Sequence, residues 1–459
     1  MLNKFLKSRI PNAKSLVKDL RKSFDYVSIL GSYVSTKRIV VGTANSSIDE
    51  VDGECGFVIK MYKNGRYCEY SCDDIKDLKA NEVIKAVKLK DVYSSPFNVK
   101  MLEEKEHVED FLREDPDSLS DSEIVKRLTA IKDEMHKNDK VINVNTAYSK
   151  RQTSKIFVSE KKCLTQKYDW VNSILFIATR DKDNIKTNYH AEGELSSLKA
   201  LNYLKKNSKD VLAIAVKMLS AKPIKPGKYT IITDPSISGL IAHEAFGHGV
   251  EMDMFVKNRA KAKDYVGKYV ASPIVDMYDG ASGVLSAASY FFDDDGIEAS
   301  KTQIIKKGIL QTGISDSLSA LTLGTKPTGN GRRESYKRKV YTRMTNTYFG
   351  KGNDKLEDMI KSVKHGYYLC QTNNGMEDPK NWQIQCTASY GLEIKDGKFT
   401  GEIVTPVVIS GYVVDLLSSI SMVSDKVKVI GSGMCGKGHK EWVFVSDGGP
   451  YLKAEAKLG

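Results

Sequence analysis

Hydrophobic and polar positions along the first half of the chain predict a mixture of strands and helices. The segment YVSILGSYVSTKRIVVGT alternates in places, and residues 140–164 and 170–180 have a similar pattern, so we expect strands there. GFVIKMY and RYCEYS flank Lys63-Asn64-Gly65, and this stretch predicts a hairpin because Asn-Gly accepts left-handed turn geometry. The stretch Asn188-Tyr-His-Ala-Glu-Gly is expected to be a loop.

Three segments of the same half have helical periodicity. Residues 73–90 carry their apolar side chains on one stripe, and residues 194–206 carry leucines at helical spacing. Between them, Ser120 and Glu123 form a capping box ahead of apolar residues at helical spacing. This pattern predicts a helix that starts at Ser120.

The best domain boundary is Ala221-Lys-Pro-Ile-Lys-Pro-Gly-Lys, because two prolines and a glycine stop any helix. We therefore expect one domain over residues 1–220 and a second over residues 221–459. After the boundary, YTIITD is expected to form a short strand, and Asp396-Gly397 predicts another hairpin. Long runs of strands with segregated helices predict an α+β fold, with an N-terminal mixed α/β domain and a strand-rich C-terminal domain.

Composition narrows the class of protein. The 459 residues have an ordinary hydrophobic and charged content, which excludes disordered and collagen-like chains. The net charge of +12 would suit an acidic partner, but acidic residues interleave with the basic ones, so nucleic acid is not the predicted partner. Seven cysteines without a CxxC pair indicate a reducing compartment. No apolar run has the length of a signal peptide or a membrane span, so we expect a soluble cytoplasmic protein.

The sharpest chemical feature is Ile241-Ala-His-Glu-Ala-Phe-Gly-His-Gly, in which His243, Glu244 and His248 form HExxxH. In the usual HExxH motif, the two histidines are four residues apart and share a helix face. Here they are five apart, so on a regular α-helix the second lies about 140° round from the first. Binding one metal ion requires either a π-bulge or a helix that ends near the second histidine. Gly247 and Gly249 flank His248 and favour the second route.

A catalytic zinc takes three protein ligands and keeps one position open. The residues alone leave the third ligand open between neighbouring and distant candidates, which are Glu251, Asp253, Cys370, Cys386, Cys435 and His439. Cys435 lies in the glycine-dense loop Gly431-Ser-Gly-Met-Cys-Gly-Lys-Gly-His. Such a loop can bring a thiolate close to another part of the backbone.

Several motifs together resemble the TldD/PmbA family of zinc metallopeptidases. They are HEAFGHGVEMD, MCGKGH, Gly448-Gly-Pro, Gly329-Asn-Gly-Arg-Arg-Glu-Ser-Tyr, Arg343-Met-Thr-Asn-Thr and Asn373-Asn-Gly-Met-Glu-Asp-Pro. The family contains TldD-like chains, which carry HExxxH and a cysteine, and PmbA-like or TldE-like chains, which lack the metal set. This sequence is similar to the TldD type. It departs from the family at the His439/Lys440 region and at Asn381-Trp382.

The resemblance implies a zinc ion held by His243, His248 and Cys435, and it makes residues 221–459 a metallopeptidase domain. Glu244 would be the general base, which takes a proton from zinc-activated water and passes it to the leaving amine.

Arg332 and Arg343 are the candidates for holding a peptide carboxylate, because guanidinium pairs bidentately with that group.

The resemblance also implies substrates and partners. The family's substrates are unfolded or short peptides in extended form, and its members work as dimers that enclose the active site. We therefore expect a peptidase that is a homodimer or a heterodimer with a PmbA-like or TldE-like chain. The alternative is a non-catalytic regulatory or scaffold protein, since some family members were named modulators of DNA gyrase. The intact Glu244 favours the enzyme, because a scaffold needs no base.

Overall fold

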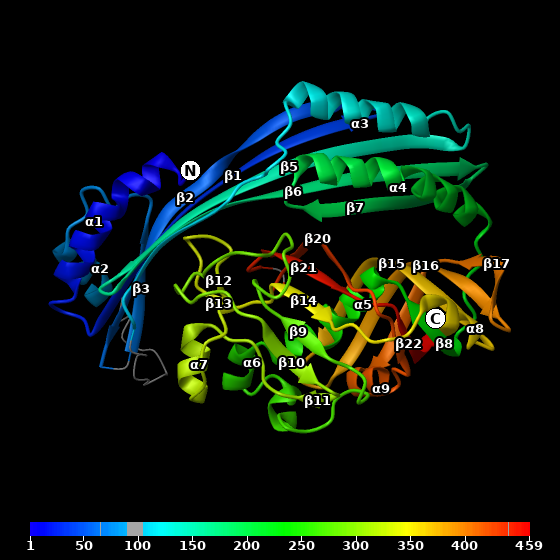
Figure 1. Cartoon of the computed structure of the whole chain (residues 1–459). Coiled ribbons are helices and arrows are strands. Elements are labelled where there is room, and N and C mark those ends of the chain that lie inside the picture. Colours follow the sequence, from blue (N-terminus) through cyan, green and yellow to red (C-terminus); the bar gives the residue numbers. More distant parts are fainter. Residues whose placement is uncertain (65, 90–103, 439) are drawn as a thin grey trace.

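The computed structural model describes residues 1–64, 66–89, 104–438 and 440–459. The first half of the chain forms a long curved sheet, and the second half lies under its concave side (Figure 1). The strand order of this first sheet is β3-β2-β1-β5-β6-β4, with β7 paired to β6. Neighbouring strands are antiparallel except for the parallel pair β4 and β6. The strands are β1 (Tyr26–Gly42), β2 (Ser46–Lys63), β3 (Arg66–Cys72), β4 (His107–Arg113), β5 (Val141–Ser159), β6 (Lys162–Asp181) and β7 (Asn184–Glu194).

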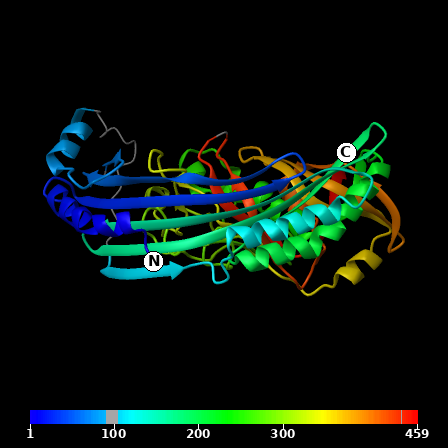
Figure 2. The ribbon, with the colours of Figure 1, turned by 90° about the horizontal axis from the view of Figure 1, so that it is seen from above.

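In the described parts of the chain, four helices cover the first sheet away from the second half of the chain. α1 (Lys4–Leu20) and α2 (Ala80–Leu89) pack at one end, and α3 (Asp121–Met135) and α4 (Ser197–Lys217) lie on the outer face of the other end (Figures 1 and 2). Each pair encloses its own apolar core, so the long strands bridge two separate clusters. The concave side is left for the second half of the chain.

The second half builds two further sheets and a two-stranded ribbon. One sheet has the order β11-β10-β9-β14-β21-β20, and the other has the order β15-β8-β22-β18-β16-β17, with β19 paired to β22. The strands are β8 (Gly227–Thr233), β9 (Met277–Asp279), β10 (Thr302–Lys306), β11 (Ile309–Leu310), β12 (Gly331–Arg332), β13 (Tyr341–Thr342), β14 (Asn346–Phe349), β15 (His365–Asp378), β16 (Gln383–Lys395), β17 (Lys398–Val404), β18 (Val407–Tyr412), β19 (Met422–Val423), β20 (Lys428–Cys435), β21 (Val443–Gly449) and β22 (Leu452–Leu458).

A short helical segment fills the space between these two sheets. It contacts β14 and β21 on one side and β15 and β16 on the other, and it contributes to the largest apolar core. This segment consists of α5 (Pro235–Leu240), η2 (Ile241–Gly247) and η3 (His248–Val250). The remaining helices are η1 (Met218–Ser220), α6 (Met252–Val256), η4 (Lys261–Tyr265), α7 (Ser317–Leu323), α8 (Leu356–Lys361) and α9 (Val413–Ser418).

The α+β prediction is confirmed, and so are the elements that local signals define. Lys63 pairs with Arg66 and Lys395 pairs with Lys398, so both predicted hairpins are present. Ser120 caps α3 by accepting a hydrogen bond from the Glu123 amide at 3.3 Å. The division at residue 220 remains a proposal. It falls between η1 and β8, and among the described residues no strand of the first sheet lies beyond β7.

Other predictions were wrong, because contacts between distant parts of the chain determine the type or the length of those elements. Residues 188–193 are not a loop but lie in β7, which pairs with β6 along its whole length. α2 begins at Ala80 rather than at residue 73, and its predicted end at residue 90 lies outside the described residues. α4 runs to Lys217, well past the predicted end at residue 206. No described helix is both long enough and apolar enough to cross a membrane.

Candidate metal centre

The HExxxH segment lies on a helix that widens before it ends. Asp234 caps α5 by accepting a hydrogen bond from the Ile237 amide at 2.8 Å, and Pro235 occupies the first turn. The next seven residues form a π-helix, in which the amide of His248 donates to the carbonyl of His243. A π-helix bonds residues five apart, so the two histidines come to the same side. Their rings lie 5.1 Å apart between centroids.

The sequence favoured only the second of the two routes, a helix that ends near His248. The structure has a π-helix first and then a tight turn of 3-10 helix starting at His248. Gly247 serves close packing rather than helix unwinding. Its backbone is helical, with φ of −63°, but an added Cβ would lie 2.2 Å from the Met344 sulfur. A larger residue would therefore have to displace the Met344 side chain or shift the helix.

Three side chains that the sequence singled out meet at this helix. The Cys435 sulfur, at the end of β20, lies 3.3 Å from His248 Nε2. One ligand atom from each of His243, His248 and Cys435 fits within 4.8 Å of the others, and no other such group occurs among the residues that were described. Asp253 pairs with Lys437 and Lys257 instead.

The remaining third-ligand candidates do not join the cluster. Cys370 and Cys386 are buried in β15 and β16, outside the group of three. His439 lies outside the described residues. Glu251 contacts the cluster only through His248, whose Nδ1 is 3.4 Å from Glu251 Oε2.

The donor set fits a zinc ion. Two imidazoles and one thiolate are the ligand types that zinc binds, and three protein ligands leave one position open. The Nδ1 atom of His243 is buried, and no described residue or other group hydrogen-bonds to it. His243 and Cys435 are 4% and 6% exposed, so the donors are largely withheld from water.

Electrostatics within the cluster favours a thiolate. Burial opposes ionisation of Cys435, but His243 and His248 outweigh it and hold the pKa of the thiol well below its usual value. Burial likewise opposes protonation of His243, yet the thiolate outweighs it and raises the pKa of His243 to about 8. The pKa of His248 is also raised well above its usual value, against burial, by the same thiolate. Cys435 is therefore ready as a metal ligand, and metal binding would displace the histidine protons.

Arg343 lies beside the cluster and contacts both Cys435 and Glu251. It is fully buried, and its Nη2 donates to the sulfur of Cys435 at 3.0 Å and to the Cys435 carbonyl at 2.9 Å. Its Nε lies 3.3 Å from Glu251, and its Nη1 donates to the Glu441 carbonyl. With these donors in use, Arg343 is placed to orient the thiolate. Its predicted contact with a substrate carboxylate would require these bonds to break.

Arg332, the other predicted substrate contact, also has local partners. Its guanidinium donates to the carbonyl of Met344 and, at 2.7 Å, to that of Phe444. It is half-buried and lines a cavity between the two halves of the chain. In the structure, therefore, neither arginine has a free guanidinium beside the three ligand atoms.

Glu251 completes the support of His248. Burial opposes its ionisation, but Lys437, His248 and Arg343 hold the pKa of its carboxyl far below the usual value. Lys437 Nζ lies 3.2 Å from Glu251 Oε2. A carboxylate beside the outer nitrogen of a ligating histidine fixes the ring and its tautomer. The sequence raised Glu251 only as a ligand, because its contact with Arg343 depends on residues far apart in the chain.

Glu244 faces the cluster without a bond of its own. Its Oε2 lies 3.9 Å from His248 Nε2, and no hydrogen bond to its carboxylate is formed within the described part of the chain. Strand β15 passes directly over it, since a Cβ on Gly375 would lie 2.6 Å from Glu244 Cγ. Burial raises the pKa of Glu244, although both histidines lower it in part. A carboxylate with these features can accept and return a proton.

Glu377 is a nearby carboxylate that the sequence analysis left without a role. Both of its oxygens are buried with no hydrogen-bond partner among the described residues, and a Cβ on Gly249 would lie 2.8 Å from Oε1. Burial raises its pKa well above the usual value, opposed by His248 and reinforced by Glu244. Its position in the segment Asn373-Asn-Gly-Met-Glu-Asp-Pro was the only signal for it.

We expect Glu251→Gln to weaken zinc binding by about 10- to 100-fold, the usual cost of losing a partner that orients a ligating histidine. Glutamine keeps the size of the side chain but removes the charge that fixes His248. Zinc affinity is measured by competition with a chromophoric chelator. Glu192→Gln is the control, because Glu192 is also a covered carboxylate between a histidine and a lysine, His190 and Lys428. Equal zinc affinity in wild type and Glu251→Gln would contradict the supporting role.

Comparisons with known proteins agree with the motifs. Residues 226–456 match the family model described as "PmbA/TldA metallopeptidase C-terminal domain". A relative from Buchnera aphidicola, named metalloprotease TldD homolog, is 36% identical over 252 residues, which are 54% of this chain and 51% of the relative. A relative from Saccharolobus solfataricus, named zinc metalloprotease TldD homolog, is 31% identical over 242 residues, which are 52% and 53% of the two chains. The chain thus spans about half the length of these relatives.

The fold is also similar to that of a solved structure. TldE from Thermococcus kodakarensis superimposes with a TM-score of 0.74 at 20% identity, over 97% of this chain and 99% of the other. At this identity the likeness concerns the fold alone. It extends over both halves of the chain, including the long curved sheet.

Proposed function

Because the chain belongs to the PmbA/TldD family of metallopeptidases, we propose that it is a zinc-dependent peptidase of the TldD type. The observation that carries the proposal is the cluster of His243, His248 and Cys435 within 4.8 Å, beside the unbonded carboxylate of Glu244. The zinc named in the Saccharolobus solfataricus relative supports the choice of metal. Two nitrogen donors and one sulfur donor support it independently.

The proposed mechanism assigns a task to each residue of the site. His243, His248 and Cys435 would hold the metal ion, which supplies Lewis-acid chemistry by polarising a peptide carbonyl and lowering the pKa of water. Glu244 takes a proton from the attacking water and returns it to the leaving amine. Arg343 keeps the Cys435 thiolate in place through its Nη2, and the covered position of the site limits the access of bulk water.

We propose unfolded or short peptides as substrates, bound in extended form. β20 pairs only with β21 within the described structure, so it is an edge strand. β7 lies against it at Gly431, and Cys435 is its last residue, at the other end. An extended peptide can add to such an edge through main-chain hydrogen bonds, which select little among side chains. A folded protein would be excluded as a substrate, because it has no free strand that could reach this buried cluster. A homodimer or a pairing with a PmbA-like or TldE-like chain is part of the same proposal.

Metal removal tests the proposed function. We expect protein treated with a zinc chelator and freed of it by gel filtration to lose cleavage of an unfolded, fluorogenic protein substrate. Stoichiometric Zn²⁺ should restore cleavage, because metal binding re-forms the three-ligand site. The matched measurement uses Mg²⁺, which prefers oxygen ligands and should restore nothing. Unchanged cleavage by the metal-free protein would refute a zinc peptidase.

The alternative from the sequence, a non-catalytic regulatory or scaffold protein, stays a prediction. Cleavage that never appears in the zinc-loaded protein, alone or with a PmbA-like chain, would favour it. Binding to DNA in that role should weaken steeply with salt, because phosphate contacts release counterions.

A further inference from the structure

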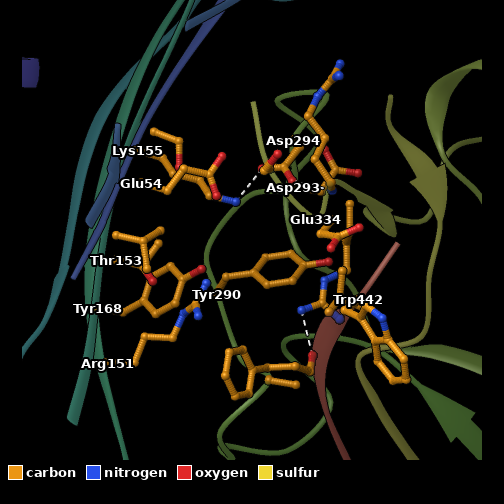
Figure 3. Close-up of a pocket in the computed structure, with 18 of the residues that line it drawn as sticks. Glu54, Arg151, Thr153, Lys155, Tyr168, Tyr290, Asp293, Asp294, Glu334 and Trp442 are labelled. Atoms are coloured by element: carbon orange, nitrogen blue, oxygen red, sulfur yellow. Dashed lines mark hydrogen bonds and ion pairs between the residues drawn. The ribbon is translucent and has the colours of Figure 1, made fainter. Parts of the chain in front are cut away.

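A separate cavity of about 370 Å³ lies between the concave face of the first sheet and the second half of the chain (Figure 3). Strands β1, β2, β5 and β6 form one wall, and the β20–β21 hairpin forms part of the other. None of the three ligand residues or Glu244 lines it. Met434 does line it, and successive residues of a strand point to opposite faces, so the hairpin separates the cavity from Cys435. Its size suits one amino-acid-sized or slightly larger ligand.

Arg151 is a cation of this cavity without a direct ion-pair partner, and the carboxylate of Glu54 acts on it only at longer range. Within the described residues, its guanidinium donates no hydrogen bond and forms no ion pair, and it lies 4.5 Å from the centroid of the Phe444 ring. Figure 3 shows Arg151 reaching from the sheet toward the middle of the cavity, where Tyr290 lies across from it. Arg151 is half-buried, and a charge that loses part of its contact with water is destabilised unless it is paired. The site therefore favours an anion beside Arg151.

Most other charged groups of the cavity have partners. The exception is Arg338, which is exposed and forms no side-chain hydrogen bond or ion pair within the described residues. Lys155 pairs with Asp294, and Arg333 forms a bidentate pair with Glu69 at 2.6 and 2.9 Å. Glu54 accepts a hydrogen bond from the Tyr336 amide at 2.7 Å. Figure 3 shows Glu54 toward the Lys155 end of the cavity, with Arg151 at the other end.

Further acidic side chains of the lining are held by backbone amides. Glu334 accepts from the Glu441 amide at 2.8 Å, and Asp293 accepts from the Gly331 amide at 2.8 Å. These carboxylates need no cation from a ligand. Of the two lining arginines without a side-chain partner, Arg338 is exposed to water, so the half-buried Arg151 is the place where an incoming negative charge would be stabilised most.

Trp170 gives a second, independent sign of a missing partner. It is directly opposite Arg151 on the neighbouring strand, is 4% exposed, and lines the cavity. Its indole N–H has no acceptor in the described structure. Opposed residues on paired strands lie within reach of one ligand group. Two donors without an acceptor thus lie together on one stretch of the cavity wall.

The wall around these donors is aromatic. The ring of Phe444 packs on Trp170 with centroids 4.4 Å apart, and Tyr168 and Tyr290 line the same space. At the hairpin side, Met434 and Trp442 are 50% and 42% exposed. These surfaces fit the apolar or aromatic body of a ligand rather than an inorganic ion.

We propose that this cavity binds a carboxylate carried on an aromatic or apolar group, with Arg151 pairing with the carboxylate and the aromatic wall holding the body. Two sources share this chemistry, a free organic acid and the C-terminal residue of a peptide. The guanidinium is suited to the planar, two-oxygen group. The proposal does not rest on the peptidase function, because no metal ligand takes part in it.

The test is isothermal titration calorimetry on the metal-free 459-residue chain, with N-acetyl-L-phenylalanine as the probe and its uncharged amide as the comparison. We expect the acid to bind at least about tenfold more tightly than the amide, because only the acid can pair with the guanidinium. Arg151→Gln should remove this preference. Arg38→Gln is the control, since Arg38 is exposed on the same sheet and outside the cavity lining.

Equal binding of the acid and the amide, or unchanged binding of the acid to Arg151→Gln, would overturn the proposal, as would no binding of the acid to wild type. Phe444→Leu is a second variant that keeps Arg151 but removes the ring beside it, and it should weaken the acid at least about threefold. A tripeptide ending in phenylalanine separates the two sources. If it competes with the probe, the cavity accepts a peptide C-terminus, and if only the single-residue acid binds, the ligand is a free acid.

Discussion

Cys435→Ala is expected to lower the bound zinc from about one ion per chain to near none and to abolish peptide cleavage. Cys435 supplies the only sulfur of the three-residue cluster, and its thiolate raises the pKa values of His243 and His248. Two imidazoles without this anion form an incomplete and more positive site. Zinc content is measured by mass spectrometry on proteins reconstituted with Zn²⁺ and dialysed.

Cys68→Ala is the matched control for this loss. Cys68 is also buried, at 2% exposed, but lies in the core between the first sheet and its two helices α1 and α2. We expect this variant to keep its zinc, which separates the loss of a ligand from the loss of a buried thiol. Zinc retained in Cys435→Ala would transfer the third ligand to Glu251 or Asp253. If the wild-type protein binds no zinc after reconstitution, the result would favour a binding or scaffold role over the peptidase.

Elements with strong local signals could be predicted from the sequence. Asn64 and Asp396 both have positive φ values, as the two-residue hairpin turns require, and each is followed by a glycine. Ser120 caps its helix for a reason that involves only the next three residues. These predictions hold because the interaction that fixes each element lies inside it.

Elements fixed by distant partners could not be predicted in the same way. β7 contains a stretch with loop-like composition, yet every one of its residues has a partner in β6. α1 continues through Pro11, because its buried face toward the first sheet outweighs the missing amide. In both cases tertiary contacts outweigh local preference.

The same distinction between local and distant contacts holds for the residues of the candidate site. The spacing of His243 and His248 identified both histidines, and the resemblance added Cys435, which the residues alone left as one of six candidates. The five-residue spacing permits two routes, and the sequence favoured a helix that ends near His248 rather than the π-helix that the structure contains. The contacts of Arg343 with Cys435 and Glu251 could not be foreseen, since they join three segments that are distant in the chain.

Glu244→Gln is expected to lower kcat by about 10²- to 10⁴-fold while zinc content stays at the wild-type level. Glutamine fills the same space under β15, but its amide cannot take a proton from water or return it to the leaving amine. KM should change little, because the side chain makes no hydrogen bond on which substrate binding would depend. Steady-state cleavage of the unfolded fluorogenic substrate, with zinc content measured on the same sample, gives both quantities.

Glu393→Gln is the matched control, since the Glu393 side chain is 16% exposed against 18% for Glu244 but lies beside His365, away from the cluster. Its kcat should equal that of wild type. Full activity in Glu244→Gln would exclude Glu244 as the base, and Glu377, the other unbonded carboxylate at the site, would then be substituted next. Cys435→Ala and Glu244→Gln are informative as a pair. Loss of zinc with loss of activity assigns metal binding, whereas loss of activity with zinc retained assigns proton transfer, which a scaffold would not need.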